Sequence, residues 1–204
     1  MRPLSRLASL ALAAFVLGIA QTTAGAQTRS TWSLQGSLLS AGLGGSAYSG
    51  IDPGVGFEVQ ARWKAAPTFS LGCGFQGTYH SFTKFQGSVK LQGLFCEPRQ
   101  IVDIGSESVF PYVSARVSLL QMNQSDSTGF NATATGGTIN VGGGVMIPIG
   151  AATAQHPTLL EFGGSAGFTQ FGDLTSTAAN GQSVTRTTGS GWNFVLRVGF
   201  AFGL

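Results

Sequence analysis

The stretch that decides the fold is WNFVLRVGFAFGL, from Trp192 to Leu204, in which large apolar residues alternate with small or polar ones. Successive side chains of a β-strand point to opposite faces, so one face of this segment would carry large apolar groups throughout. The other face would carry Asn193, Arg197 and small residues. A strand of a water-soluble sheet buries its apolar face and shows charge to water. This pattern instead suits a wall with lipid outside and a narrow, partly polar lumen inside.

The composition favours the same environment. Charged residues make up 9% of the chain, against roughly 25% in an ordinary soluble domain. The chain also has 31 glycines and 15 phenylalanines, which would make a poor water-facing surface. Beyond its first residues, no apolar run approaches the roughly 20 residues that a transmembrane helix needs. A closed β-barrel pairs its backbone groups between strands, and the composition therefore predicts a barrel in a membrane.

The N-terminal segment has the features of a signal peptide. Arg2 and Arg6 precede an uncharged apolar run of about 14 residues, and the small residues Ala24–Ala26 suit cleavage. We therefore predict a signal peptide over residues 1–26 and one barrel domain over residues 27–204. Two of the 11 Lys and Arg residues lie in the signal peptide, which leaves nine basic against eight acidic residues. Nucleic acid is not an expected partner, because binding its phosphates needs an excess of positive charge.

Eight stretches of period-two character are separated by turn-like or polar segments. They cover residues 31–43, 55–64, 69–82, 85–96, 110–122, 138–149, 158–171 and 192–204. With the N-terminus in the periplasm, the external connections would be residues 44–54, a short turn near 83, 123–137 and 172–190. The periplasmic connections would be residues 65–68, 97–108 and 150–157. Longer loops outside than inside are typical of outer-membrane barrels.

Three segments resemble strands of the small eight-stranded outer-membrane barrels of the OmpA, OmpX and OmpW type. They are PYVSARVSLLQ (Pro111–Gln121), PTLLEFGGSAGF (Pro157–Phe168) and LRVGFAFGL (Leu196–Leu204). The resemblance covers the predicted mature chain as a pattern. It implies an all-β, eight-stranded antiparallel up-and-down transmembrane β-barrel, monomeric and surrounded by lipid of the bacterial outer membrane.

The same resemblance implies that the barrel-assembly machinery binds the C-terminal strand. Members of this superfamily usually end on an aromatic residue, whereas here Phe200 and Phe202 precede a final Leu204. We expect no peptidoglycan-binding domain after the predicted barrel, so we do not extend the resemblance to tethering of the cell wall.

Six charged residues are predicted to form a polar network in the lumen: Glu58, Arg62, Lys90, Arg116, Glu161 and Arg197. The interior of an eight-stranded barrel is just wide enough for its own side chains. Charges buried there must pair, because an unpaired buried charge is costly. Two interpretations fit the pattern, namely a salt-bridged plug that fixes the barrel and a narrow or gated polar path through it.

Two cysteines lie on neighbouring predicted strands, about equally far from the turn between them. Export would bring Cys73 and Cys96 into a compartment that permits a disulfide. In the predicted phases, however, Cys73 shares a face with Phe75, whereas Cys96 shares the opposite face with Lys90 and Gln92. A disulfide would then require a β-bulge. The alternative is two separate small hydrophobic residues.

Several aromatic residues lie near predicted strand ends, where the interface girdles of membrane barrels are found. They are Trp32, Trp63, Tyr79, Tyr112 and Trp192. Ordinary strand aromatics are the alternative interpretation.

No enzyme, cofactor or metal site is expected. His80 and Ser81 are adjacent, and acidic residues occur in the predicted outer loops, but their spacing does not place a nucleophile, a base and an orienting group together. We therefore predict a non-enzymatic integral membrane protein with a structural or surface-interaction role through its external loops. The sequence does not name the external partner. One alternative is a narrow channel or transporter for small or hydrophobic solutes, and another is a secreted soluble β-protein.

Overall fold

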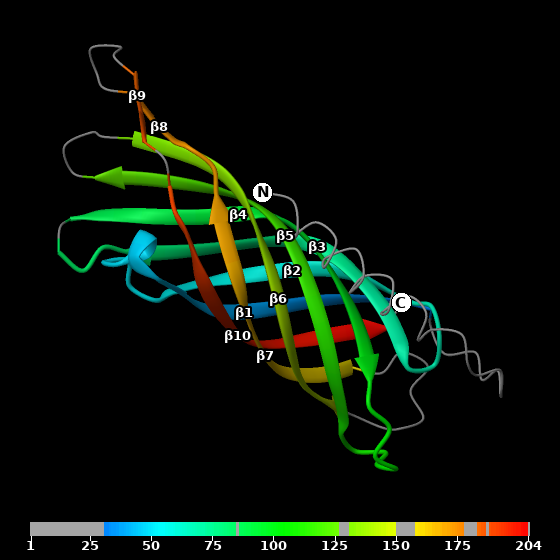
Figure 1. The fold of residues 1–204 in the computed structure, drawn as a ribbon. Coiled ribbons are helices and arrows are strands. Elements are labelled where there is room, and N and C mark those ends of the chain that lie inside the picture. Colours follow the sequence, from blue (N-terminus) through cyan, green and yellow to red (C-terminus); the bar gives the residue numbers. More distant parts are fainter. Residues whose placement is uncertain are drawn as a thin grey trace.

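The computed structural model describes residues 31–84, 86–126, 131–149, 158–177, 183–186 and 188–203 (Figure 1). The predicted signal peptide over residues 1–26 and the final Leu204 lie outside these ranges. The strands of the wall are β1 (Trp32–Gly44), β2 (Gly54–Lys64), β3 (Phe69–Ser81), β4 (Gly87–Ile101), β5 (Phe110–Asp126), β6 (Asn131–Ile149), β7 (Thr158–Phe171) and β10 (Ser190–Gly203). Three short elements complete the described chain, namely a 3-10 helix η1 (Ser46–Tyr48), β8 (Leu174–Thr177) and β9 (Ser183–Arg186).

The eight wall strands close into a barrel. β1 to β7 pair in chain order, and β10 pairs antiparallel with both β7 and β1. β8 and β9 form a hairpin that continues the sheet from the outer end of β6 and projects beyond the barrel (Figure 1). The predicted eight-stranded antiparallel barrel is confirmed.

Large apolar side chains cover the outside of the barrel. Leu38, Leu94, Leu119 and Val141 are each at least 65% exposed, although they lie in the middle of long strands. Such a surface is favourable in a hydrocarbon environment and not in water. The described residues contain no helix that is both long and apolar enough to span a bilayer.

The connections distinguish the two ends of the barrel. The described chain starts and finishes at one end, where Ser33 pairs with Gly203. That end also carries the connections 65–68 and 102–109. The other end carries the short β3–β4 connection and also the longer η1 connection and the segment with the β8–β9 hairpin. In bacterial barrels the end with the short turns lies in the periplasm, so η1 and the hairpin lie on the extracellular side.

The faces of β4 are opposite to those predicted. Val89, Leu91 and Phe95 point into the lumen and are buried, whereas Lys90 and Leu94 point outward. The prediction assumed that the more apolar face of each strand meets lipid. In β4, Val89 and Leu91 instead fill the outer part of the lumen and Phe95 packs against Arg116, so the rule fails for this strand.

Three strands are longer than predicted. β4 continues past the predicted end at residue 96 to Ile101, and Pro98 lies within the strand. β5 and β6 extend through most of the polar segment 123–137, which was expected to be a loop. Asn123 pairs with Thr133 there, so polar residues continue the hairpin in water where no apolar surface is required.

Candidate functional site

Seven charged side chains meet inside the periplasmic half of the barrel. They are the glutamates Glu58, Glu97 and Glu161 and the arginines Arg62, Arg99, Arg116 and Arg197. All seven are at most 7% exposed although each carries a full charge. Four arginines against three glutamates leave an excess of one positive charge. The site is therefore a compact ion-pair network at which side chains fill the lumen.

Glu97 is the centre of this network. Its carboxylate lies 2.6 Å from an Arg116 nitrogen, 2.6 Å from Arg197, 2.8 Å from Arg99 and 3.3 Å from Arg62. Alternation along β4 points Glu97 inward, opposite its outward neighbour Cys96. One carboxylate thus bridges arginines from four different strands across the lumen.

Glu161 forms a second centre. Arg99 donates two hydrogen bonds to its carboxylate, at 2.8 and 2.9 Å, in the bidentate arrangement that guanidinium groups favour. The Tyr112 hydroxyl donates to the same carboxylate at 2.7 Å, and Arg99 stacks over the Tyr112 ring at 3.9 Å from its centre. Arg197 Nε lies 2.9 Å from Glu161 and so joins this centre to Glu97.

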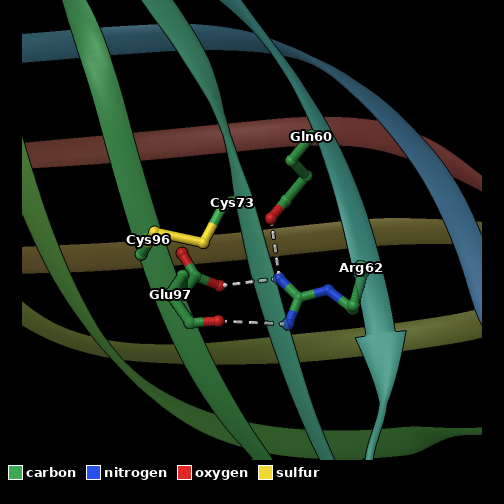
Figure 2. The surroundings of a disulfide bond; sticks show 5 residues. All are labelled: Gln60, Arg62, Cys73, Cys96 and Glu97. Carbon is green, nitrogen blue, oxygen red and sulfur yellow. Dashed lines mark hydrogen bonds and ion pairs between the residues drawn. A yellow bond between two sulfur atoms is a disulfide. The ribbon is translucent and has the colours of Figure 1, made fainter.

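The remaining three charged residues extend the network along and around the lumen. Arg116 donates to Glu58 at 2.7 Å and lies over the Phe95 ring at 4.1 Å from its centre. Arg62 donates to Gln60 at 2.9 Å and contacts both the side chain and the backbone carbonyl of Glu97, as Figure 2 shows. Each arginine is therefore held by two or more groups.

Inward-facing glycines make the space for these long side chains. A Cβ at Gly163 would lie 2.4 Å from the Tyr112 hydroxyl and 2.8 Å from Arg197 Nε. At Gly72 it would lie 2.3 Å from the Gln60 side-chain oxygen and 2.8 Å from Arg62. The glycine content of the wall is thus partly a requirement of the lumen.

An apolar cluster lies in the outer half of the lumen. A buried cluster consists of Tyr48, Val89, Leu91, Leu120, Met122, Ala134 and Phe171. We call these residues the outer cluster. Between the outer cluster and the charged network, Asn140, Asn193 and Thr169 hydrogen-bond to one another. Packed side chains therefore fill the lumen at several successive levels.

The connection between β1 and β2, which contains η1, covers the outer cluster at the extracellular mouth of the barrel. η1 places Tyr48 in the mouth, where its ring meets Phe171 edge-on with centroids 6.2 Å apart. Its hydroxyl donates to the Gly189 carbonyl at 3.0 Å. Burial raises the pKa of the Tyr48 hydroxyl, although a backbone hydrogen bond opposes this effect. The hydroxyl therefore remains a donor that joins two extracellular connections.

The structure places five of the six predicted lumen residues inside the barrel, namely Glu58, Arg62, Arg116, Glu161 and Arg197. Lys90 was assigned wrongly, because β4 has the opposite phase and its ammonium faces outward. The sequence interpretation also missed Glu97 and Arg99, which it placed in a connection. Continuing the alternation from Phe95 through residues 97 and 99 finds them only when Phe95 is assigned to the inward face, as in the structure.

Tyr112 was also assigned wrongly as an interface aromatic. It is 2% exposed and points into the lumen, as even-numbered residues of β5 do. Its hydroxyl donates a hydrogen bond to the Glu161 carboxylate there, and lipid would offer no such acceptor.

Four predicted interface aromatics lie on the outer face near strand ends. Trp32 and Trp63 pair with each other at the periplasmic end, and Tyr79 and Trp192 lie toward the extracellular end. Each is between 45% and 54% exposed. From residue 32 to residue 44, which pairs with Trp192, β1 extends about 40 Å at roughly 3.3 Å per residue. A strand tilt of about 40° reduces this to about 30 Å along the membrane normal, close to a hydrocarbon core.

Cys73 and Cys96 form a disulfide on the outer face of the barrel (Figure 2). They are direct partners in the β3–β4 register, with Cα atoms 4.1 Å apart. The predicted need for a bulge is wrong, because it rested on the inverted phase of β4. The disulfide and the charged network lie on opposite faces of β4, since Cys96 points outward and the next residue, Glu97, points inward.

His80 does not form a nucleophile–base pair with Ser81. Its ring nitrogens lie 2.9 Å from the Thr78 hydroxyl and 3.0 Å from the Asp52 carbonyl oxygen. Ser81 points to the opposite face and contacts the Asp52 carboxylate. These contacts fasten the first extracellular connection to the end of β3.

Comparison with solved structures finds the same fold in other outer-membrane proteins. The Neisserial surface protein A shares 16% identity with this chain at a TM-score of 0.57, over 87% of this chain and 100% of its own. Ail, the attachment invasion locus protein of Yersinia pestis, shares 11% identity at a TM-score of 0.53, over 86% and 99%. A second structure of Ail, in complex with the heparin analogue sucrose octasulfate, gives a TM-score of 0.54 at 11% identity and the same coverage. No protein-family model and no curated protein sequence matches the chain.

Proposed function

We propose that this chain, a small eight-stranded barrel of the bacterial outer membrane, is a sealed scaffold that presents extracellular β-structure to surface partners. The filled lumen is the observation that carries the proposal. Glu58, Glu97, Arg99 and Glu161 are each at most 1% exposed, so water has almost no access to the centre of the network.

The ion-pair network acts in this proposal as the plug that fixes the barrel. Its side chains come from β2, β4, β5, β7 and β10, so they hold opposite walls together. Breaking one partner of a buried pair costs about 3–5 kcal/mol, so opening a path would be expensive. The outer cluster would also have to move before a solute entered.

The extracellular end supplies the surface that a partner would meet. β8 and β9 project beyond the barrel (Figure 1), and Val184 on this hairpin is 63% exposed. Two of the similar structures carry names that refer to a surface location or to attachment. Those names support a surface role here without specifying its partner.

Conductance of the purified, folded barrel in planar lipid bilayers tests the seal. We expect no discrete conductance steps above the leak of the bare bilayer. Steady ion conductance would refute the sealed scaffold and favour the alternative, a narrow channel for small solutes.

Labelling on intact cells tests the display of the hairpin. A Thr185→Cys variant should react with a membrane-impermeant maleimide, because residue 185 lies exposed in β9. The matched control is Glu107→Cys, in an exposed periplasmic turn, which should react only after the cells are opened. The reverse pattern would contradict the orientation of the barrel.

A further inference from the structure

A polar hollow lies on the outer wall at the extracellular ends of β4, β5 and β6. It has a volume of about 200 Å³ and is lined by residues that include Lys90, Asn123 and Thr133. These three residues are neighbours in one row of the sheet, since Lys90 pairs with Asn123 and Asn123 pairs with Thr133. The charged network and the lumen lie on the other side of the wall.

The side chains in this hollow are arranged as donors. The Thr133 hydroxyl donates to Asn123 Oδ1 at 3.2 Å, which leaves the Asn123 amide hydrogens for another acceptor. Neither the Lys90 ammonium nor Asn123 Nδ2 has a hydrogen bond to any residue that the structure describes. None of the lining residues is acidic. The hollow therefore offers positive charge and amide donors, and none of its lining residues supplies a carboxylate to them.

The position of the hollow identifies its surroundings. Lys90 is the direct partner of Tyr79, an exposed aromatic residue on the outer face near the extracellular end. Farther toward the periplasm on the same face of β4 lies Leu94, which is 65% exposed. The outer face of β4 thus changes from apolar Leu94 through Gln92 to the paired Lys90 and Tyr79, as it would where hydrocarbon gives way to lipid head groups.

We propose that this hollow binds a phosphate group of an outer-leaflet glycolipid. Lys90 would supply the charge, the Asn123 amide a directed hydrogen bond, and the Tyr79 ring contact with the adjoining sugar or acyl region. An ammonium facing the membrane at this depth has a natural counter-ion in a lipid phosphate. The site would fix one lipid against β4–β6, beside the extracellular hairpin, since Thr133 pairs with Thr175 of β8.

Lipid retention by the folded barrel tests this proposal. Native mass spectrometry would measure how much bisphosphorylated lipid A stays bound to the wild-type barrel and to a Lys90→Gln variant. The variant should bind about fivefold more weakly, the upper range for a solvent-accessible ion pair. Lys84→Gln is the matched control, because Lys84 is an exposed lysine in the β3–β4 connection and lies outside the hollow.

Two further probes identify the ligand. Dephosphorylated lipid A should bind the wild-type barrel as weakly as lipid A binds the Lys90→Gln variant. Inorganic phosphate at the same concentration should not displace lipid A, since it lacks the anchoring acyl chains. The proposal is overturned by equal retention in wild type and Lys90→Gln, by an equal loss in Lys84→Gln, or by displacement with inorganic phosphate.

Discussion

Neutralising Glu97 is the perturbation to which the lumen should be most sensitive. Glu97→Gln keeps the size of the side chain but removes the charge that four arginines share at 2.6 to 3.3 Å. Four buried guanidinium groups would then face two carboxylates, Glu58 and Glu161. The excess positive charge in the lumen would rise from one to two.

The cost follows from the burial of the unpaired charge. Removing one partner of a buried ion pair lowers the free energy of unfolding by about 3–5 kcal/mol. The glutamine oxygen still accepts one hydrogen bond, so we expect a value near the lower end of this range. For a urea dependence of about 2 kcal/mol per molar, the unfolding midpoint should fall by roughly 1.5–2 M.

Urea unfolding in lipid vesicles, followed by tryptophan fluorescence, measures this change. Trp32, Trp63 and Trp192 lie on the outer face, so their emission reports the transfer between lipid and water. Glu107→Gln, in an exposed periplasmic turn, makes the same chemical change outside the barrel wall and should leave the midpoint unchanged.

A double variant distinguishes the network from a general defect. Because Arg197 donates two hydrogen bonds to Glu97, Glu97→Gln combined with Arg197→Gln should cost clearly less than the two single changes added together. The reasoning is refuted if Glu97→Gln lies within about 1 kcal/mol of wild type, or if the two changes are additive. If Glu97→Gln does not fold, Arg62→Gln tests the same network through its longest contact with Glu97.

Three further predictions concern the space in the lumen, the disulfide and the seal. Gly163→Ala should destabilise the barrel by about 1–3 kcal/mol through overpacking against Tyr112 and Arg197. Its neighbour Gly164→Ala faces lipid and should be tolerated, so equal urea midpoints would contradict the assigned faces. Replacing both Cys73 and Cys96 by alanine should lower the free energy of unfolding by about 3 kcal/mol, as expected for a cross-link over 23 residues. An unchanged urea midpoint under oxidising conditions would show that the cross-link does not stabilise the barrel. Tyr48→Phe should lower the free energy of unfolding by about 1 kcal/mol, because the hydrogen bond to Gly189 is lost. Amide hydrogen exchange near Gly189 should also become faster. An unchanged exchange rate would argue that η1 does not close the mouth of the barrel.

The alternation of side chains was sufficient to predict most of the wall. β7 has the predicted bounds of residues 158 and 171, and the predicted faces of β2 and β5 agree with the structure. The prediction succeeded for these strands because the hydrocarbon outside the barrel accepts only apolar groups. The lipid-facing side of each strand is therefore limited to apolar residues. The placement of Glu58, Arg116 and Arg197 in the lumen followed from the same rule.

The same rule could not determine the phase of β4. Both faces of this strand carry apolar residues, and the inward ones, Val89, Leu91 and Phe95, are the larger group near its outer end. Which face meets lipid depends on the residues that neighbouring strands bring to the lumen. The error at Lys90 and the supposed bulge between the cysteines both follow from this one phase, whereas Glu97 was missed because the strand was predicted to end at residue 96.

The sequence by itself determined that the chain forms a membrane barrel, because a nearly uncharged chain with period-two strands has few other ways to satisfy its backbone in lipid. Tertiary structure alone decided which of the inward side chains meet and that they fill the lumen. Arg62, Glu97 and Arg197 lie far apart in the sequence and meet because barrel closure brings β2, β4 and β10 around one narrow space. The choice between plug and path depends on that convergence, since the packing of side chains from several strands is a property of the closed barrel and of no single strand.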